Sequence, residues 1–235
     1  MTVERTYAKD ASVRELFDMT CCTQYCAAEK QFDGKVAERD LQRYRRRGPS
    51  AVTRLMLAEL RRWPLQGEDL LDVGSGIGVI GAELADTGLA SATLVEASPA
   101  YLDVARAEIE SRYESRPTRF LLGDFATIAD TLTDADVVTL DRVVCCYPDG
   151  EALLRGAASR TRRLLAFSYP RDRSYMRTLT ALQNFWRRLR GNAFRTFVHP
   201  PERMGAVLEA AGLVRIARQG TLVWVLDVYR RRENV

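Results

Sequence analysis

A short apolar run at residues 70–73 leads directly into glycines at every second position, Gly74, Gly76 and Gly78. Glycine adopts positive backbone φ angles at little cost and lets the backbone approach a ligand closely. The run therefore predicts a strand, a tight turn that contacts a ligand, and a helix. A dinucleotide-binding turn would have its third glycine at position 79, where the chain has Val79. The spacing thus disfavours a pyrophosphate ligand and a nicotinamide enzyme.

After the first 63 residues the chain alternates between strand-like runs and helical stretches. The strand-like runs are rich in Leu and β-branched residues and fall at 69–73, 92–96, 118–122, 136–140, 163–167, 214–218 and 222–229. The helical patterns fall at 78–87, 99–113, 126–132, 150–159, 174–190 and 201–211. This alternation predicts an α/β fold, with a doubly wound, mostly parallel seven-stranded sheet. Only residues 219–221 connect the last two strands, which is too short for a parallel crossover and predicts an antiparallel hairpin.

The segment before the first strand shows helical patterns only. Residues 27–47 are rich in good helix formers, and residues 51–62 carry apolar positions on an Arg-rich background. Residues 48–49, Gly-Pro, separate the two. We therefore predict an N-terminal helical arm or cap over 1–63 and a Rossmann-like domain over 64–235.

Charge and composition exclude several classes of protein. The chain has 35 Lys+Arg against 31 Asp+Glu, a formal net charge of +4, and this mild, dispersed excess does not predict a nucleic-acid partner. No window holds the roughly 18 uninterrupted apolar residues of a membrane span, and residues 1–20 lack the apolar core of a secretion signal. Five cysteines, an odd number, do not predict a disulfide framework. We therefore expect a cytoplasmic protein.

Acidic residues follow the second and third predicted strands. Glu96 ends the second strand, 22 residues after Gly74 (96 minus 74), where a carboxylate can accept hydrogen bonds from both hydroxyls of a ribose. The third strand leads into Gly123-Asp124-Phe125, which offers an acceptor for an adenine amino group and a ring to lie against it. The alternative interpretation is that Glu96 and Asp124 only cap the helices that follow them.

This ordered set of motifs resembles the class I S-adenosylmethionine-dependent methyltransferases. The resemblance covers about residues 64–229 and rests on the loop at 72–78, Glu96, the tripeptide at 123–125 and the segment 135–149. It implies an enzyme that uses S-adenosyl-L-methionine and transfers its methyl group, with the N-terminal arm helping to enclose the substrate.

The resemblance also implies roles for individual residues in cofactor binding. Asp72 would hold the amino group of S-adenosyl-L-methionine, Glu96 its ribose and Asp124 its adenine. Leu140, Asp141 and Arg142 would border the sulfonium. The full implied cofactor-binding set is Asp72, Gly74, Ser75, Gly76, Gly78, Glu96, Ala97, Asp124, Phe125, Leu140 and Asp141. No metal ion is implied.

Two residues are candidates for catalysis, His199 and Tyr147. Transfer to a hydroxyl requires removal of a proton, and His199, the sole histidine, has the side chain best suited to act as a base near neutral pH. Tyr147 follows the fourth strand at the expected mouth of the site. The alternatives are a structural role for His199 in its loop and packing beneath the arm for Tyr147.

The fourth strand also bears on the acceptor. It continues as Leu140-Asp141-Arg142-Val143, unlike the Asn/Asp-Pro-Pro-Tyr/Phe motif of methyltransferases that act on amino groups of nucleic-acid bases. We therefore predict a small-molecule acceptor, methylated on a hydroxyl or carboxylate oxygen. The segments around Tyr147 and His199 are similar in part to magnesium-protoporphyrin methyltransferases, which implies a bulky acceptor. The alternative function is a catalytically silent S-adenosylmethionine-binding protein with a regulatory or partner role.

Two further features leave alternatives open. One helical face within 174–190 collects apolar residues, with arginines largely elsewhere. They are Tyr175, Met176, Leu179, Leu182, Phe185, Trp186 and Leu189. The first interpretation is core packing or a lid, and the second is a peripheral membrane surface over 175–190. Cys21, Cys22 and Cys26 would be either reduced, half-buried cysteines or a thiol site for a metalloid. The sequence predicts no oligomeric state.

Overall fold

The structure, a computed structural model, describes residues 27, 28, 30–111 and 117–232 of the chain. Cys21, Cys22 and Cys26 lie outside the described residues. Within the described part, no helix is both long and apolar enough to cross a membrane.

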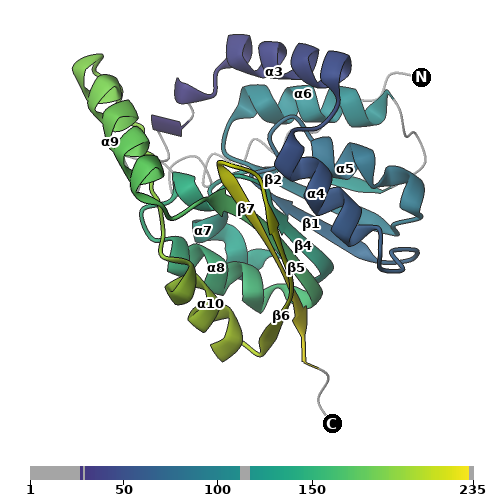
Figure 1. The fold of residues 1–235 in the computed structure, drawn as a ribbon. Coiled ribbons are helices and arrows are strands. Elements are labelled where there is room, and N and C mark those ends of the chain that lie inside the picture. Colours follow the sequence, from purple (N-terminus) through teal and green to yellow (C-terminus); the bar gives the residue numbers. More distant parts are fainter. Residues whose placement is uncertain (1–26, 29, 112–116, 233–235) are drawn as a thin grey trace.

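A seven-stranded sheet in the order β3-β2-β1-β4-β5-β7-β6 forms the centre of the molecule (Figure 1). The strands are β1 Asp69–Val73, β2 Ser91–Glu96, β3 Thr118–Leu122, β4 Ala135–Leu140, β5 Thr161–Pro170, β6 Leu213–Gly220 and β7 Trp224–Arg231. Strands β1 to β5 run parallel to one another, and β7 runs antiparallel to both of its neighbours. The mostly parallel sheet and the antiparallel hairpin predicted from the sequence are therefore confirmed.

The hairpin turn lies two residues later than predicted. Gly220 is the last residue of β6 and pairs with Val225, so residues 221–223 form the connection. Thr221 explains the shift, because its hydroxyl accepts the backbone N–H of Trp224 at 3.0 Å and its own N–H donates to the Trp224 carbonyl at 2.8 Å. These two bonds close a turn where the sequence pattern suggested a strand.

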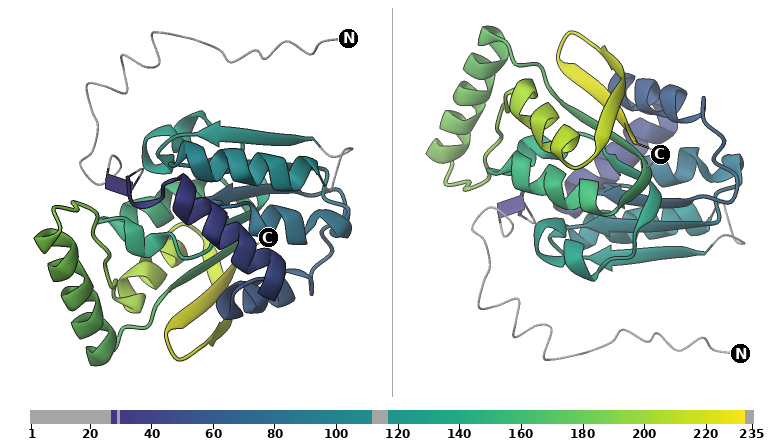
Figure 2. Two further views of the ribbon diagram at one scale, coloured as in Figure 1. Left: turned by 90° about the horizontal axis from the view of Figure 1, so that it is seen from above. Right: turned by 90° about the horizontal axis from the view of Figure 1, so that it is seen from below.

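Helices cover both faces of the sheet (Figures 1 and 2). On one face lie α4, α5 and α6, with α3 packed against α6, and on the other lie α7, α8 and α10. Their bounds are α3 Gly34–Arg47, α4 Ala51–Leu60, α5 Val79–Glu83, α6 Pro99–Glu110, α7 Phe125–Ile128, α8 Gly150–Ser159, α9 Ser174–Leu189 and α10 Pro201–Ala210, with 3-10 turns at Ala85–Thr87, Ala129–Thr131 and Val144–Cys146. Helix α9 projects from the edge of the molecule (Figure 1).

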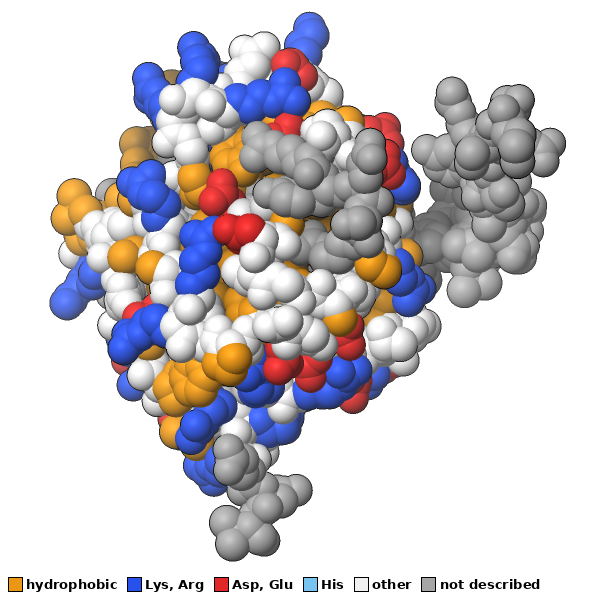
Figure 3. Space-filling model, turned by 90° about the vertical axis from the view of Figure 1, so that its right-hand side faces the viewer, with side chains coloured by type: hydrophobic (Ala, Val, Ile, Leu, Met, Phe, Trp, Pro, Cys, Tyr) orange, Lys and Arg blue, Asp and Glu red, His pale blue; other side chains and the backbone are white. Residues whose placement is uncertain are grey.

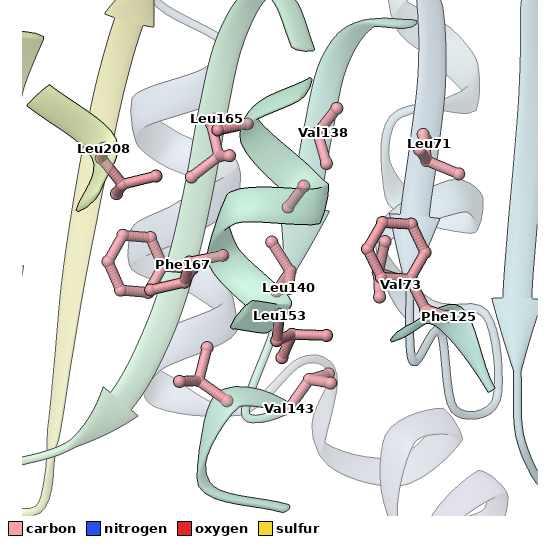
Figure 4. Packing of buried hydrophobic residues seen from close by; sticks show 14 of the residues in the cluster. Leu71, Val73, Phe125, Val138, Leu140, Val143, Leu153, Leu165, Phe167 and Leu208 are labelled. Carbon is pink, nitrogen blue, oxygen red and sulfur yellow. The ribbon is translucent and has the colours of Figure 1, made fainter. Parts of the chain in front are cut away.

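One apolar cluster fills each side of the sheet. On the first side, Val138 and Leu165 pack against Leu153 of α8 and Leu208 of α10 (Figure 4). On the other side, Met56 of α4 is fully buried in a cluster with side chains of β1, β2 and β7. Full burial of one such side chain stabilises the fold by about 1.5–3 kcal/mol. Helix α4 thus shares a core with the sheet, and the predicted division between arm and domain stays a prediction.

The helical pattern over residues 27–47 starts a new helix, α3, at Gly34. Asp33 is the reason, because its Oδ1 accepts the backbone N–H of Val36 at 3.0 Å and so caps the helix. The chain just before this cap is non-helical at Phe32, and it passes over the carboxyl edge of the sheet.

Basic and acidic side chains are interspersed on the face shown in Figure 3. Several arginines have a carboxylate within 4.0 Å, for example Arg163 beside Glu68 and Arg203 beside Glu151. Such mixed surfaces add little to stability, because exposed pairs contribute about 0–1 kcal/mol each.

Candidate functional site

A cavity of about 280 Å³ lies between the carboxyl ends of β1 to β4 and the N-terminal helices. The sheet side is lined by Asp72, 74–77, 95–97, 123–125, 141–143 and 146–148, and the helical side by Ala28, Phe32, Asp40, Arg43, Tyr44, 48–50, Thr53, Val79, Ile80 and Tyr101. Ligands of open parallel sheets bind at this edge, where the strand order reverses. Here the reversal lies between β1 and β4.

The turn after β1 has the conformation that its glycines permit. Gly74, Gly76 and Gly78 all have positive φ angles, of 61°, 56° and 77°. Gly74 also has no room for a side chain, because an added Cβ would lie 2.5 Å from a methyl group of Val143. The turn is therefore locked against the segment that follows β4, and its backbone faces the cavity.

Glu96 is the last residue of β2 and is 8% exposed. Its Oε2 accepts the backbone N–H of Gly76 at 2.8 Å, and its Oε1 accepts that of Ser98 at 2.9 Å. Burial raises the pKa of Glu96, and these N–H donors oppose the rise. Each carboxylate oxygen can accept a further hydrogen bond. The side chain can therefore bind two hydroxyl groups and keep its hydrogen bonds to Gly76 and Ser98.

Asp72 is 1% exposed in β1. Its Oδ1 accepts the hydroxyl of Thr139 at 2.7 Å, whereas Oδ2 has no hydrogen-bond partner among the described residues. Burial raises the pKa of Asp72 to about 7, with smaller contributions from the charges of Asp141 and Glu96. The hydroxyl of Ser75 is also buried and unpartnered within the described part of the chain. Unpartnered buried polar atoms are costly, and these two fit an ammonium group that enters the cavity.

Asp124 caps α7 and binds a second group from the loop after β4. Its Oδ1 accepts the backbone N–H of Ala126 at 3.0 Å and the hydroxyl of Tyr147 at 2.6 Å. Burial and the charge of Asp124 raise the pKa of Tyr147 well above its usual value. The phenol is thus a hydrogen-bond donor in this state. Capping does not remove Asp124 from the cavity, which it lines beside Phe125.

Asp141 and Arg142 follow β4 in a constrained conformation. Asp141 accepts the hydroxyls of Thr53 and Ser168, each at 2.6 Å. Arg142 has a φ of 61°, and its N–H donates to the Ser168 hydroxyl at 2.8 Å. A left-handed conformation costs a non-glycine residue about 1–2 kcal/mol. The hydrogen bonds to Thr53 and Ser168 stabilise this strained conformation. It places the side chains of Asp141 and Arg142 along the cavity.

The N-terminal segment closes the other side of the cavity through polar contacts with the start of α6. The hydroxyl of Ser98 donates to the Phe32 carbonyl at 2.6 Å, and the hydroxyl of Tyr101 donates to Asp40 at 2.7 Å. The rings of Phe32 and Tyr101 also meet edge to face, 5.7 Å apart. Arg43 of α3 also lines the cavity, 3.5 Å from the carboxylate of Asp40, which lines it too.

The structure brings most of the predicted site residues to this one cavity. Those that line it are Asp72, Gly74, Ser75, Gly76, Glu96, Ala97, Asp124, Phe125, Asp141 and Tyr147. Leu140 is instead fully buried in the core, and Gly78 caps α5. His199 does not line the cavity; its Nε2 lies 3.0 Å from the Tyr147 carbonyl oxygen.

Thr53, Phe32, Asp40 and Arg43 line the cavity without having been predicted. Thr53 reaches Asp141 across 88 positions of sequence, and a single threonine in a helical pattern carries no signal of such a contact. The helical pattern of the N-terminal segment predicts a buried face, and the resemblance predicts that this arm helps to enclose the substrate, but neither indicates which residues line the cavity. Within the described part, no three His, Cys, Asp or Glu side chains gather closely enough to hold a metal ion.

Comparison with known proteins agrees with this geometry. Residues 70–165 match the model of a family described as a methyltransferase domain. Among curated proteins, no sequence is similar enough to count as a relative. In fold, the chain is similar to magnesium protoporphyrin IX methyltransferase from Synechocystis with bound S-adenosylhomocysteine (TM-score 0.70, 16% identity, covering 89% of this chain and 100% of that one).

Two further solved structures are similar to the chain. An O-methyltransferase family protein from Burkholderia thailandensis has a TM-score of 0.65 at 17% identity, covering 86% of this chain and 62% of that one. A TehB-like S-adenosylmethionine-dependent methyltransferase from Corynebacterium glutamicum has a TM-score of 0.59 at 16% identity, covering 85% and 100%. Residues 70–165 thus match a methyltransferase domain, and the chain has the fold of S-adenosylmethionine-dependent methyltransferases.

Proposed function

We propose that the chain transfers the methyl group of S-adenosyl-L-methionine to an oxygen atom of a small molecule in the cavity, with a carboxylate as the favoured acceptor. One observation carries the proposal. Asp72 near the end of β1, Glu96 at the end of β2 and Asp124 just after β3 line the same cavity. Their spacing along the sheet edge supplies acceptors for the amino group, the ribose and the adenine of a single molecule.

The cofactor supplies an electrophilic methyl group on its sulfonium when it binds. We assign its amino group to Asp72 and Ser75, because both present buried atoms without partners in the described part of the chain. We assign its ribose to Glu96, whose oxygens each have a lone pair left. Asp124 and Phe125 are assigned to the adenine, since they provide an acceptor and an apolar ring on the adjacent strand.

The preference for a carboxylate acceptor rests on the charges and proton affinities at the cavity. Arg142 lines it with 39% of its side chain exposed and with its Nε 3.5 Å from the Asp141 carboxylate. The two terminal nitrogens of a guanidinium can bind a further carboxylate through parallel hydrogen bonds. A carboxylate is ionised at neutral pH and needs no base. A hydroxyl does need one, but the raised pKa of Tyr147 disfavours its phenolate and His199 does not line the cavity.

Two measurements test the proposal directly. Calorimetry should detect binding of S-adenosylhomocysteine, and transfer of a labelled methyl group should be found with carboxylic acids in a panel that also holds phenols and amines. Transfer to amines alone would contradict an oxygen acceptor. Cofactor binding without transfer to any acceptor would favour the catalytically silent alternative.

We expect the affinity for S-adenosylmethionine to rise with pH up to about 7 and then to level off. The pKa of Asp72 is about 7, and only its ionised form attracts an ammonium group. Below that pH, binding must displace a proton, which costs up to about tenfold in affinity per pH unit. Calorimetry between pH 5.5 and 8, chosen to bracket about pH 7, measures this slope.

The variant Asp72→Asn should lose this pH dependence and bind the cofactor more weakly at all pH values. Asp130→Asn, at an exposed position, is the matched control. Burial raises the pKa of Asp72 above that of an unfolded chain, so its ionisation destabilises the fold as pH rises. Asp72→Asn should therefore unfold at no lower temperature than the native chain. An unchanged slope in this variant would assign the pH dependence to another group.

His199 is proposed as a positioning residue, which differs from the base expected from the sequence. Its ring nitrogen holds the backbone of Tyr147, at 3.0 Å from the carbonyl oxygen. His199→Ala should therefore lower the rate by less than about tenfold and keep the pH profile, because one neutral hydrogen bond contributes about 0.5–1.5 kcal/mol. His199→Gln should restore part of the loss. A fall of about 10²–10⁴ with loss of the acidic limb would instead establish general base catalysis.

A further inference from the structure

Helix α9 presents an apolar stripe to the outside of the molecule. The exposed fractions are Tyr175 45%, Leu179 43%, Leu182 51%, Phe185 54%, Trp186 52% and Leu189 60%. Leu222, at the tip of the β6–β7 hairpin, is 80% exposed and extends the stripe, because the hydroxyl of Tyr175 donates to its carbonyl. Core packing, one interpretation of these residues, was wrong, since only Met176 among them is buried. None of them lines the cavity, and the lid stays a prediction.

The opposite side of α9 holds the helix to the rest of the protein. Met176 and Thr180 are buried one turn apart, and one turn later Asn184 donates to the Thr196 carbonyl at 2.7 Å and accepts the Thr196 N–H at 3.0 Å. Met176, Thr180 and Asn184 are spaced four residues apart and so lie on one face of α9, which contacts the rest of the protein. The wider apolar stripe therefore points into solvent, the reverse of an ordinary surface helix.

The charges around the stripe have one sign. Residues 173–201 contain no Asp or Glu, but six arginines. They are Arg173, Arg177, Arg187, Arg188, Arg190 and Arg195. The nearest preceding acid, Asp172, is bound by Arg177 at 2.6 and 2.8 Å. A second copy of this helix would bring more arginines and no carboxylate, so self-association through the stripe would be opposed by repulsion.

An anionic surface with an apolar interior matches both properties of α9. We propose that the α9 stripe is a docking surface for a bilayer that contains anionic lipids, with the helix lying in the plane of the headgroups. Its 16 residues span only about 24 Å at 1.5 Å per residue, which is too short to cross a bilayer. The aromatic and leucine side chains would enter the acyl boundary, and the exposed Arg188 and Arg190 would bind lipid phosphates. Arg187 and Arg195 instead donate to Thr196 and to the Phe194 carbonyl.

The position of α9 supports this assignment. The helix projects at the edge of the molecule in all three ribbon views, away from the sheet (Figures 1 and 2). The segment that follows it returns to the cavity wall, where the ring of Phe194 lies 5.4 Å from that of Phe32. A bilayer bound by α9 would thus lie near the wall of the cavity.

Vesicle flotation with the full-length protein tests the proposal. We expect it to float with phosphatidylcholine vesicles that contain phosphatidylglycerol, and to bind vesicles of phosphatidylcholine alone at least about tenfold more weakly. High salt should release the bound protein, because it screens the arginines. Failure to bind the anionic vesicles at low salt would overturn the proposal.

Paired variants locate the bound surface. Leu182→Asp combined with Trp186→Asp should weaken vesicle binding by about tenfold or more, whereas Val214→Asp, at an exposed apolar position of β6 (41%), should not. In the same way, Arg188→Glu with Arg190→Glu should abolish the preference for anionic vesicles. Arg155→Glu on the exposed face of α8 is the charge control.

All these variants change exposed positions and should stay folded. Light scattering, which measures the oligomeric state, completes the test. A native dimer that the Leu182→Asp, Trp186→Asp variant converts to a monomer would show that the stripe binds a second copy, and the membrane proposal would be wrong. Equal vesicle binding by the α9 variants and their controls would also contradict it. Methyl transfer in solution should be unchanged in the α9 variants, so this test is independent of the proposed function.

Discussion

Replacing Glu96 by alanine should weaken binding of S-adenosylhomocysteine by about two orders of magnitude or more. The proposed ribose contacts are two hydrogen bonds to a charged acceptor, each worth about 1.5–3 kcal/mol, and each 1.4 kcal/mol is about a tenfold change in affinity. The variant also loses the bond from the carboxylate to the Gly76 N–H, which holds the glycine turn. Calorimetry measures the affinity.

Glu96→Gln and Glu110→Ala make the result specific. The amide keeps the size of Glu96 and one acceptor oxygen, so its affinity should lie between the native and alanine values. Glu110, at the exposed end of α6 with a 61% exposed side chain, should have no effect. Burial raises the pKa of Glu96, which means that the ionised carboxylate destabilises the folded state. Removing this charge offsets part of the loss of its hydrogen bonds, so Glu96→Ala should unfold close to the native temperature. Native affinity in a folded Glu96→Ala protein would show that the ribose lies elsewhere.

The parts of the fold that the sequence predicts well are those set by neighbouring residues. The glycine turn follows from three glycines that each need a positive φ, and Glu96 reaches the site because it ends a strand in parallel register with β1. The sheet order brings such strand ends together without any information on side-chain contacts. The hairpin was predicted from a short connection alone, and its register shifted only because Thr221 forms the turn.

The parts that the sequence did not predict depend on contacts between distant segments. Thr53 and Asp141 are joined by one hydroxyl, and neither residue has a local pattern that indicates the other. The helix α9 has a clear apolar face, but periodicity does not say whether a face points inward, and here Met176 and Thr180 on another side make the inward contacts. His199 followed from chemistry alone, since a lone histidine has no pattern that places it.

A second large effect is expected at Arg142, whose side chain is proposed to bind the acceptor. Arg142→Gly should lower kcat/KM for a carboxylate acceptor by about a hundredfold or more, because the guanidinium would no longer bind it through charge-assisted hydrogen bonds of about 1.5–3 kcal/mol each. The backbone should not suffer, because a φ of 61° suits glycine. Arg142→Lys, which keeps the charge but not the paired donors, should recover part of the activity.

Arg142→Ala separates the side chain from the backbone. It should lose as much activity as Arg142→Gly, but it retains the strained φ, which costs a non-glycine residue about 1–2 kcal/mol. The glycine variant should therefore unfold a few degrees higher than the alanine variant, at about 2–4 °C per kcal/mol for a chain of this size. Equal activity in native and glycine proteins would remove Arg142 from acceptor binding. A glycine variant less stable than the alanine variant would show that the bonds from Ser168 and Thr53 to Asp141 do not impose the left-handed conformation.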